Sequence, residues 1–195
     1  MEQSAKLTCV NLRGTSGSGK TTIVRNILMQ QGWHSINAQG KIWGYANPEL
    51  RWIIIGSYEN TCGGCDTIRT QQEVEDRIEY CLNQGYNVLF EGLLISTLTS
   101  RWLELAKRVS DRANVLFYYL DTPIEECLRR IDLRRKSAGN FKELNPKNTV
   151  DRVKAIDSTY KKLSQAGCYC LKGSQQEIIK NLNAWFGLGG NNVPQ

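Results

Sequence analysis

Gly14-Thr15-Ser16-Gly17-Ser18-Gly19-Lys20-Thr21 is the stretch of this chain that decides its fold. It fits G-x-x-x-x-G-K-S/T, the phosphate-binding P-loop. The apolar residues 7–12 before it predict a buried strand, and the helical spacing of apolar residues over 22–28 after it predicts a helix. In this order the backbone N–H groups of the loop and the helix N-terminus can bind phosphate. The sequence therefore predicts that the chain binds a nucleoside triphosphate.

The residues of the loop have distinct expected roles. Lys20 is expected to reach the β- and γ-phosphates of ATP, and the Thr21 hydroxyl is expected to ligate Mg²⁺. The predicted ATP-binding residues are Gly14, Thr15, Ser16, Gly17, Ser18, Gly19, Lys20, Thr21 and Thr22.

Length and composition limit the remaining possibilities. With 195 residues the chain is most simply one domain over residues 1–187, followed by a flexible tail over 188–195. No apolar run approaches membrane-spanning length and the N-terminus lacks a signal-peptide pattern, so we expect no membrane partner. Seven cysteines in such a chain indicate reduced thiols in the cytoplasm, which for a viral protein is that of the host. His34 is the only histidine, which excludes a multi-histidine metal site.

Strand-like and helix-like segments alternate along the chain, which predicts an α/β sandwich of three layers. The expected sheet is mainly parallel and five-stranded, with a β-hairpin insertion at residues 41–56. Strands are predicted at residues 7–12, 41–46, 52–56, 87–90, 115–120 and 168–171, and helices at 22–28, 70–84, 97–109, 123–136, 149–165 and 175–186.

A second site is predicted where Val88-Leu89-Phe90-Glu91-Gly92 ends a buried strand. An acid at this place resembles a Walker B element, whose carboxylate holds Mg²⁺ directly or through water. Glu91 is therefore the second expected metal ligand, although Asp is more usual there. The alternative is an ordinary carboxylate that faces solvent at the end of a strand.

Arginines four residues apart point to a lid over the nucleotide. Arg130 and Arg134 project from one face of the helix at 123–136, and the turn-rich residues 137–148 follow. Arginine binds phosphate through two hydrogen bonds and stabilises phosphoryl transfer, so we expect a helical lid at about residues 125–148. The alternative is a solvated helix face.

The glycine-rich loop over residues 56–67 is the expected acceptor side. A kinase needs a carboxylate to deprotonate the attacking hydroxyl, and Asp66 is the first candidate, with Glu59 and Glu91 as alternatives. Asp66 could instead cap the helix at 70–84. We favour a loop role for Cys62-x-x-Cys65 over zinc or redox chemistry, because no second suitable cysteine pair is predicted nearby.

Positive charge is concentrated in residues 101–162, which hold fifteen Lys and Arg against nine Asp and Glu. This charge could neutralise the triphosphate, or it could bind a polyanion such as DNA or RNA. Four aromatic residues could stack on bases or could pack in the core and hairpin, namely Trp43, Tyr45, Trp52 and Tyr58.

Taken together, these motifs resemble nucleoside- and nucleotide-kinase-like P-loop proteins. The resemblance rests on Gly14–Thr21, Phe90-Glu91-Gly92 and Arg130-Ile131-x-x-Arg134. It implies a P-loop NTPase fold in which Arg130 and Arg134 lie on the lid and touch the nucleotide.

Further segments resemble the 5-hydroxymethyluracil DNA kinases of bacterial viruses, which phosphorylate a hydroxymethyl group on a base within DNA. These segments are Gly56-Ser57-Tyr58, Cys62-Gly63-Gly64-Cys65-Asp66-Thr67 and Leu120-Asp121-Thr122-Pro123-Ile124-Glu125-Glu126-Cys127. The resemblance implies that the acceptor is bound by Tyr58, Gly63, Gly64 and Asp66.

The sequence thus predicts an ATP- and Mg²⁺-dependent kinase with DNA as its partner. In this hypothesis Lys20, Arg130 and Arg134 neutralise charge and Asp66 is the base. One alternative is a kinase of a free nucleoside, nucleotide or small metabolite. Another is a non-catalytic nucleotide-binding regulatory protein.

Overall fold

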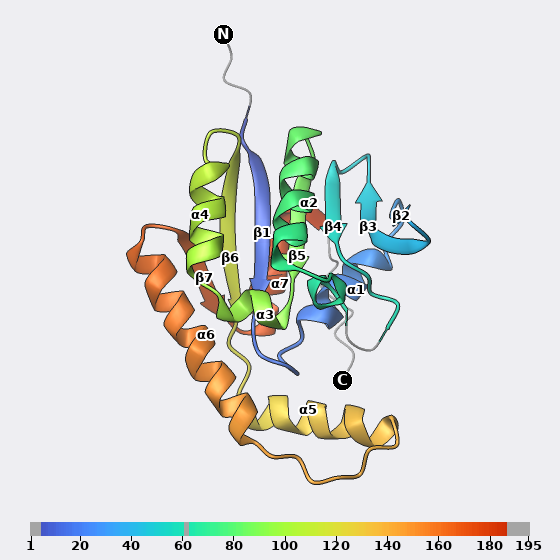
Figure 1. The fold of residues 1–195 in the computed structure, drawn as a ribbon, viewed down its shortest axis with the longest axis vertical. Coiled ribbons are helices and arrows are strands. Elements are labelled where there is room, and N and C mark those ends of the chain that lie inside the picture. Colours follow the sequence, from blue (N-terminus) through green and yellow to red (C-terminus); the bar gives the residue numbers. More distant parts are fainter. Residues whose placement is uncertain (1–4, 61–62, 187–195) are drawn as a thin grey trace.

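The computed structural model describes residues 5–60 and 63–186, which form a sheet with helices on both faces (Figure 1). Its strands are β1 (Leu7–Arg13), β2 (His34–Ala38), β3 (Lys41–Asn47), β4 (Trp52–Ile55), β5 (Asn87–Glu91), β6 (Ala113–Leu120) and β7 (Tyr169–Gly173). Its helices are α1 (Lys20–Leu28), α2 (Gln71–Asn83), α3 (Leu93–Thr97), α4 (Ser100–Arg108), α5 (Ile124–Ser137), α6 (Lys147–Gln165) and α7 (Gln175–Phe186), with the short 3-10 helix η1 (Cys65–Thr67). The predicted tail at 188–195 and Cys62 of the predicted cysteine pair lie outside the described residues.

The expectation of a five-stranded sheet is wrong. The sheet has seven strands in the order β2-β3-β4-β5-β1-β6-β7, and β2 and β3 are antiparallel. The predicted hairpin exists as β3 and β4, but β4 also pairs in parallel with β5. The hairpin therefore extends the main sheet and is no separate insertion. Strand β2 gave no signal because its residues His-Ser-Ile-Asn-Ala are mostly exposed and mostly polar.

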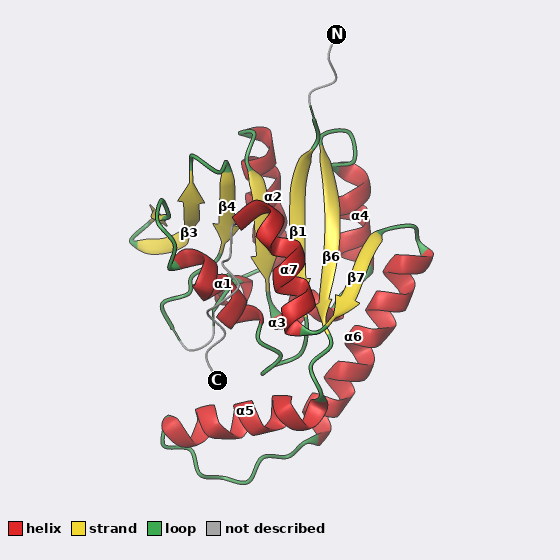
Figure 2. Ribbon diagram, turned by 180° about the vertical axis from the view of Figure 1, so that it is seen from behind, coloured by secondary structure: helices red, strands yellow, loops and turns green. Residues whose placement is uncertain are grey.

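Two apolar cores hold the layers together, because successive side chains of a strand point to opposite faces. Val88 and Phe90 of β5 join one core, whereas Leu89 between them joins the other. The first core packs against α2, α4 and α6, and the second against α1 and α7. Helix α7 accordingly covers the face that Figure 2 turns toward the viewer.

One short helix was not predicted. The helix expected over 97–109 exists as α4 (Ser100–Arg108), and α3 (Leu93–Thr97) precedes it, separated from it by Leu98 and Thr99. Leu98 has an extended backbone, which ends α3. Because α3 begins directly after β5, a helix N-terminus follows Glu91.

The segments with predicted chemistry meet at one edge of the sheet. The P-loop follows β1, Glu91 ends β5, and residues 121–123 lead from β6 into α5. Because β1, β5 and β6 are parallel, their carboxyl ends lie together. Helix α5 extends across this edge, and residues 138–146 connect it back to α6 (Figures 1 and 2). Within residues 5–60 and 63–186, no helix has the length and apolar character needed to cross a membrane.

Candidate active site

The P-loop is tightly packed against the lid helix. Gly17 and Gly19 have φ angles of +77° and +103°, which favour glycine. A Cβ on Gly17 would lie 2.5 Å from the carbonyl oxygen of Cys127 in α5. Thr122 also donates a hydrogen bond of 2.9 Å to the carbonyl of Ser18. The loop therefore needs glycine for its conformation and for its contact with α5.

Lys20 is buried within the loop that it follows. Its side chain is 7% exposed, and Nζ donates to the carbonyl oxygens of Gly14 at 2.8 Å and Thr15 at 3.1 Å. Burial lowers the pKa of Lys20, while the negative charges of Glu91 and Asp66 act in the opposite direction. Lys20 is thus a cation held at the carboxyl edge, between the loop and two carboxylates.

Two hydroxyl groups of the loop are buried without partners. In the described part of the chain, Thr15 Oγ1 and Ser18 Oγ accept and donate no hydrogen bond. Buried polar groups in native proteins are nearly always hydrogen-bonded to protein, water or ligand. These hydroxyls can donate to phosphate oxygens, which agrees with the predicted role of the loop.

Thr21 and Glu91 lie together, as expected of two ligands of one metal ion. Thr21 Oγ1 donates to Glu91 Oε1 at 3.0 Å, and Glu91 is 2% exposed. The alternative of a solvent-facing Glu91 is therefore wrong. Burial raises its pKa to about 7, although Lys20 and the Thr21 hydrogen bond oppose this shift.

The donor atoms at this place fit Mg²⁺. A hydroxyl and a carboxylate are hard oxygen ligands, and Mg²⁺ at phosphates typically takes one or two such protein ligands. Across residues 5–60 and 63–186, no cluster of three or more His, Cys, Asp or Glu side chains could form an all-protein metal site. A metal ion here would complete its coordination with phosphate oxygens and water.

The glycine-rich loop is closed on itself and lies against Glu91. Gly64 N donates to the Ser57 carbonyl at 2.8 Å. Arg25 of α1 donates to the Tyr58 carbonyl at 3.1 Å and also to that of Asn60. A Cβ on Gly64 would lie 2.6 Å from Glu91 Oε1. The predicted acceptor loop is thus in contact with the predicted metal ligand.

Asp66 is placed in η1 and binds the start of α3. Its carboxylate accepts hydrogen bonds from Leu93 N at 2.8 and 3.0 Å and from Leu94 N at 3.4 Å. The suggestion that Asp66 caps the helix at 70–84 is wrong, because Thr70 caps α2 by accepting from Glu73 N. The Asp66 carboxylate remains exposed to solvent.

Asp66 is close enough to Lys20 and Glu91 to affect their titration. Its negative charge raises the pKa of Lys20 and the pKa of Glu91. The other candidate base, Glu59, is exposed and accepts a hydrogen bond of 2.8 Å from the Tyr45 hydroxyl. The structure therefore brings Asp66 toward the buried groups at the carboxyl edge.

The two lid arginines differ in their contacts with the P-loop. Arg130 donates to the carbonyl of Gly17 at 3.2 Å and to Glu126 at 2.6 Å. Arg134 is close enough for its charge to lower the pKa of Lys20, and no described residue forms an ion pair with it. Arg129 instead faces Glu126 alone, at 2.7 Å. Arg130 thus reaches the loop, whereas Arg134, one helical turn further along α5, acts on Lys20 only through its charge.

Of the two explanations for the aromatic residues, core packing fits most of them. Tyr45, Trp52 and Tyr58 are 8%, 2% and 5% exposed and belong to the second core, so base stacking by these rings is wrong. Trp43 is half-buried and contacts Tyr80 edge to face. Tyr58 stays a predicted acceptor residue only through its place in the loop and its buried hydroxyl, which no described group bonds.

Sequence reasoning missed Arg13, the residue immediately before the P-loop. Arg13 is fully buried and donates to the carbonyls of Ser96 and Leu98 and to the hydroxyls of Tyr119 and Thr159. Burial lowers its pKa. Its only signal was a charged residue at the end of an apolar strand. The network connects the start of the P-loop to α3 and α6.

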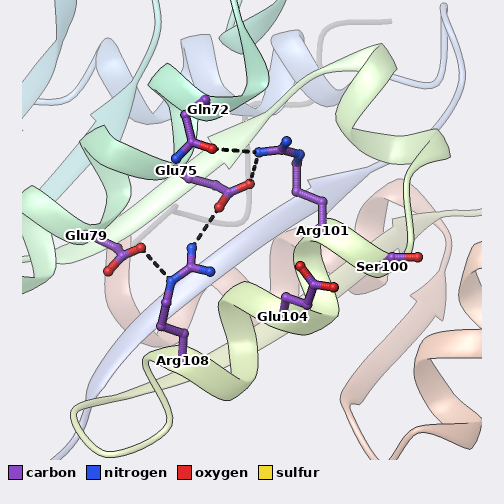
Figure 3. A pocket seen from close by; sticks show the side chains of 7 residues that line it. All are labelled: Gln72, Glu75, Glu79, Ser100, Arg101, Glu104 and Arg108. Carbon is purple, nitrogen blue, oxygen red and sulfur yellow. Dashed lines mark hydrogen bonds and ion pairs between the residues drawn. The ribbon is translucent and has the colours of Figure 1, made fainter.

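Part of the positive charge in residues 101–162 is neutralised by ion pairs. Figure 3 shows Arg101 and Arg108 of α4 reaching the buried carboxylate of Glu75 on α2, and Arg108 also bonds Glu79. These cations are neutralised at the helix interface. The part of the segment on α5 and α6 therefore carries the net positive surface charge.

Comparisons with known proteins identify the family of this chain. A family model described as 5-hmdU DNA kinase matches residues 2–181. A 5-hmdU DNA kinase of Pseudomonas phage PaMx11 is 34% identical over 84% of this chain and 88% of the relative. A 5-hmdU DNA kinase of Bacillus phage SP10 is 25% identical over 92% of this chain, which spans only 29% of that longer relative.

A solved structure supports the fold alone. It comes from the PezAT chromosomal toxin-antitoxin system of Streptococcus pneumoniae and has a TM-score of 0.53 at 16% identity. The likeness covers 96% of this chain and 81% of that structure. With a family match over nearly the whole chain and a relative of one-third identity, the chain belongs to the 5-hmdU DNA kinase family.

Proposed function

We propose that this protein transfers the γ-phosphate of ATP to the hydroxymethyl group of 5-hydroxymethyluracil in DNA. The observation that carries the proposal is the grouping of Lys20, Glu91 and Asp66 at one edge of the sheet. A buried cation beside a metal-binding carboxylate suits a triphosphate, and an exposed carboxylate beside them suits a hydroxyl acceptor. The names of its phage relatives supply the acceptor.

On the donor side, the residues bind and neutralise phosphate. The P-loop, from Gly14 to Thr22, would hold the triphosphate, with Lys20 donating to the β- and γ-phosphates. Thr21 and Glu91 would hold Mg²⁺, which neutralises charge on the phosphates when bound. Arg130 and Arg134 add positive charge from the lid at residues 125–148, and such arginines contribute about 10³–10⁵ in rate.

On the acceptor side, Asp66 would act as the general base. The hydroxymethyl oxygen attacks the γ-phosphorus, the bond from that phosphorus to the β–γ bridging oxygen breaks, and the hydroxyl proton passes to Asp66. Both Asp66 oxygens already accept hydrogen bonds from the N-terminus of α3, which fixes the carboxylate in place. Tyr58, Gly63 and Gly64 would form the wall of the acceptor site.

The chain would work as one domain with a closing lid. Closure of α5 over the P-loop would exclude water from a transferable phosphate. Arg130 contacts Gly17, so α5 already reaches the loop that it would cover. We propose that the protein acts in the cytoplasm of an infected host, on ATP and phage DNA.

The experiment supplies γ-labelled ATP and Mg²⁺ with plain DNA, DNA containing 5-hydroxymethyluracil, or free nucleosides. The proposal expects label in the modified DNA alone. Label in free nucleosides alone would establish a small-molecule kinase instead. Label released only as inorganic phosphate, or ATP bound and never consumed, would indicate a nucleotide-binding regulator.

A further inference from the structure

One aromatic side chain of the lid is free of the core. Phe141 is 76% exposed, the highest value among the aromatic residues described, whereas Tyr169 on β7 is 56% exposed. Phe141 lies between α5 and α6, in the segment 138–146 that runs beyond the carboxyl edge of the sheet (Figure 2). The ring is therefore accessible to a partner.

The surroundings of Phe141 are basic. Residues 133–150 hold five Lys and Arg and a single acid, Glu143. Lys136 pairs with Asp132, but in the ranges that the structure describes Arg135, Lys142 and Lys147 form no ion pair. This differs from α4, whose arginines are neutralised by Glu75 and Glu79. Unpaired cations around an exposed ring are the surface that a nucleic acid requires.

The proposed chemistry demands a particular state of the DNA. Lys20 and Glu91 are buried, so a hydroxymethyl group can approach them only if its base enters the site. A base stacked in a duplex cannot do so, and it must be extruded. Extrusion leaves a gap in the stack. Apolar side chains of DNA-bending proteins insert between base steps, so a protein ring has room to enter such a gap.

We infer that residues 135–147 form a duplex-DNA-binding loop in which Phe141 fills the gap left by the extruded base. Arg135, Lys142 and Lys147 bind the phosphates that flank the target nucleotide. The inference rests on the proposed function, and it assigns to the lid a second role toward the acceptor. Arg130 contacts the P-loop, whereas Phe141 lies beyond the end of α5.

The test compares wild type with Phe141→Ala on two substrates that carry 5-hydroxymethyluracil, one duplex and one single-stranded. A single strand has no stack to restore, so only the duplex should need the ring. We expect the KM for duplex to rise about 5- to 150-fold, the range that base–aromatic stacking gives. The KM for single strand and the KM for ATP should stay within about twofold. Phe141→Trp should retain duplex binding.

Tyr169→Ala is the matched control, since it removes an exposed ring from a distant edge strand. Replacing Lys142 and Lys147 by Ala should reduce the slope of log Kd against log salt by about two, and Lys107→Ala on α4 should leave it unchanged. Melting temperatures verify that every variant is folded.

The outcomes separate this inference from the proposed function. Phe141→Ala with an unchanged KM for duplex, or with equal losses on duplex and single strand, overturns the inference while the kinase activity stands. A rise in the KM for ATP instead would mean that Phe141 stacks on the nucleotide. Failure of wild type to phosphorylate either DNA would refute the proposed function itself.

Discussion

Asp66→Asn separates catalysis from helix capping at the same residue. Asp66 accepts from Leu93 N and Leu94 N at the start of α3, and its proposed role is to take the hydroxyl proton. Asn keeps an oxygen for the N–H groups of α3 but cannot act as a base at neutral pH. Because Asn and Asp cap helices about equally well, the change retains the structure and removes the chemistry.

The expected magnitudes differ widely for the two roles. Loss of general-base catalysis lowers the rate about 10²–10⁴-fold, which is about 3–5 kcal/mol of activation free energy. Loss of the charge at the helix N-terminus lowers the free energy of unfolding by about 0.3–1 kcal/mol. In a chain of 195 residues this lowers Tm by at most about 4 °C.

The assay measures initial rates on modified DNA at saturating ATP, together with thermal unfolding. Asp66→Ala removes both the cap and the base and should lose about 0.5–2 kcal/mol of stability as well. Glu59→Gln is the control for the alternative base and should keep its rate. Near-normal transfer by Asp66→Asn would refute the reasoning, and loss of transfer in Glu59→Gln would move the base to Glu59.

Three further perturbations follow from the buried groups. The first concerns Glu91 without nucleotide and Mg²⁺, whose pKa is raised from 4.5 to about 7 in the folded protein. Its protonated form favours the folded state, so its full contribution to the free energy of unfolding is present below pH 4.5 and is lost as the pH rises to about 7. The full loss is about 3 kcal/mol. Urea unfolding between about pH 4 and 8 should show that Glu91→Gln removes this pH dependence of the free energy of unfolding. Gly64→Ala would place a Cβ 2.6 Å from Glu91 Oε1, so we expect kcat to fall at least about tenfold. Gly167→Ala, between α6 and β7, also introduces a Cβ at a positive φ, +81°, but meets no atom within 4 Å, and it should keep kcat. Glu75→Gln should lower the free energy of unfolding by about 1–3 kcal/mol in urea and leave kcat unchanged, because its carboxylate bonds two arginines away from the P-loop.

Local patterns predicted the donor half of the site. The P-loop, Glu91 at the end of its strand, and the two lid arginines depend on residues that are near in sequence or on the parallel order of β1 and β5. A glycine loop between a strand and a helix adopts one geometry, and residues four apart on a helix share a face. These features needed no knowledge of distant contacts.

The acceptor half depended on contacts that the sequence does not encode locally. Asp66 and Leu93 are 27 residues apart, and only the fold of η1 against α3 joins them. The edge strand β2 lacked apolar alternation, so its pairing with β3 extended the sheet beyond the expected five strands.

By itself the sequence determined a P-loop α/β protein with a carboxylate at the end of β5 and a basic helix after β6, because short motifs and the periodicity of apolar residues encode these features locally. The tertiary structure alone decided how the charges and aromatic rings are used. Glu75 neutralises arginines of α4, and three of the four candidate stacking aromatics are buried. Phe141 and its neighbouring cations are left at the surface, because burial and ion pairing depend on which elements the chain packs together.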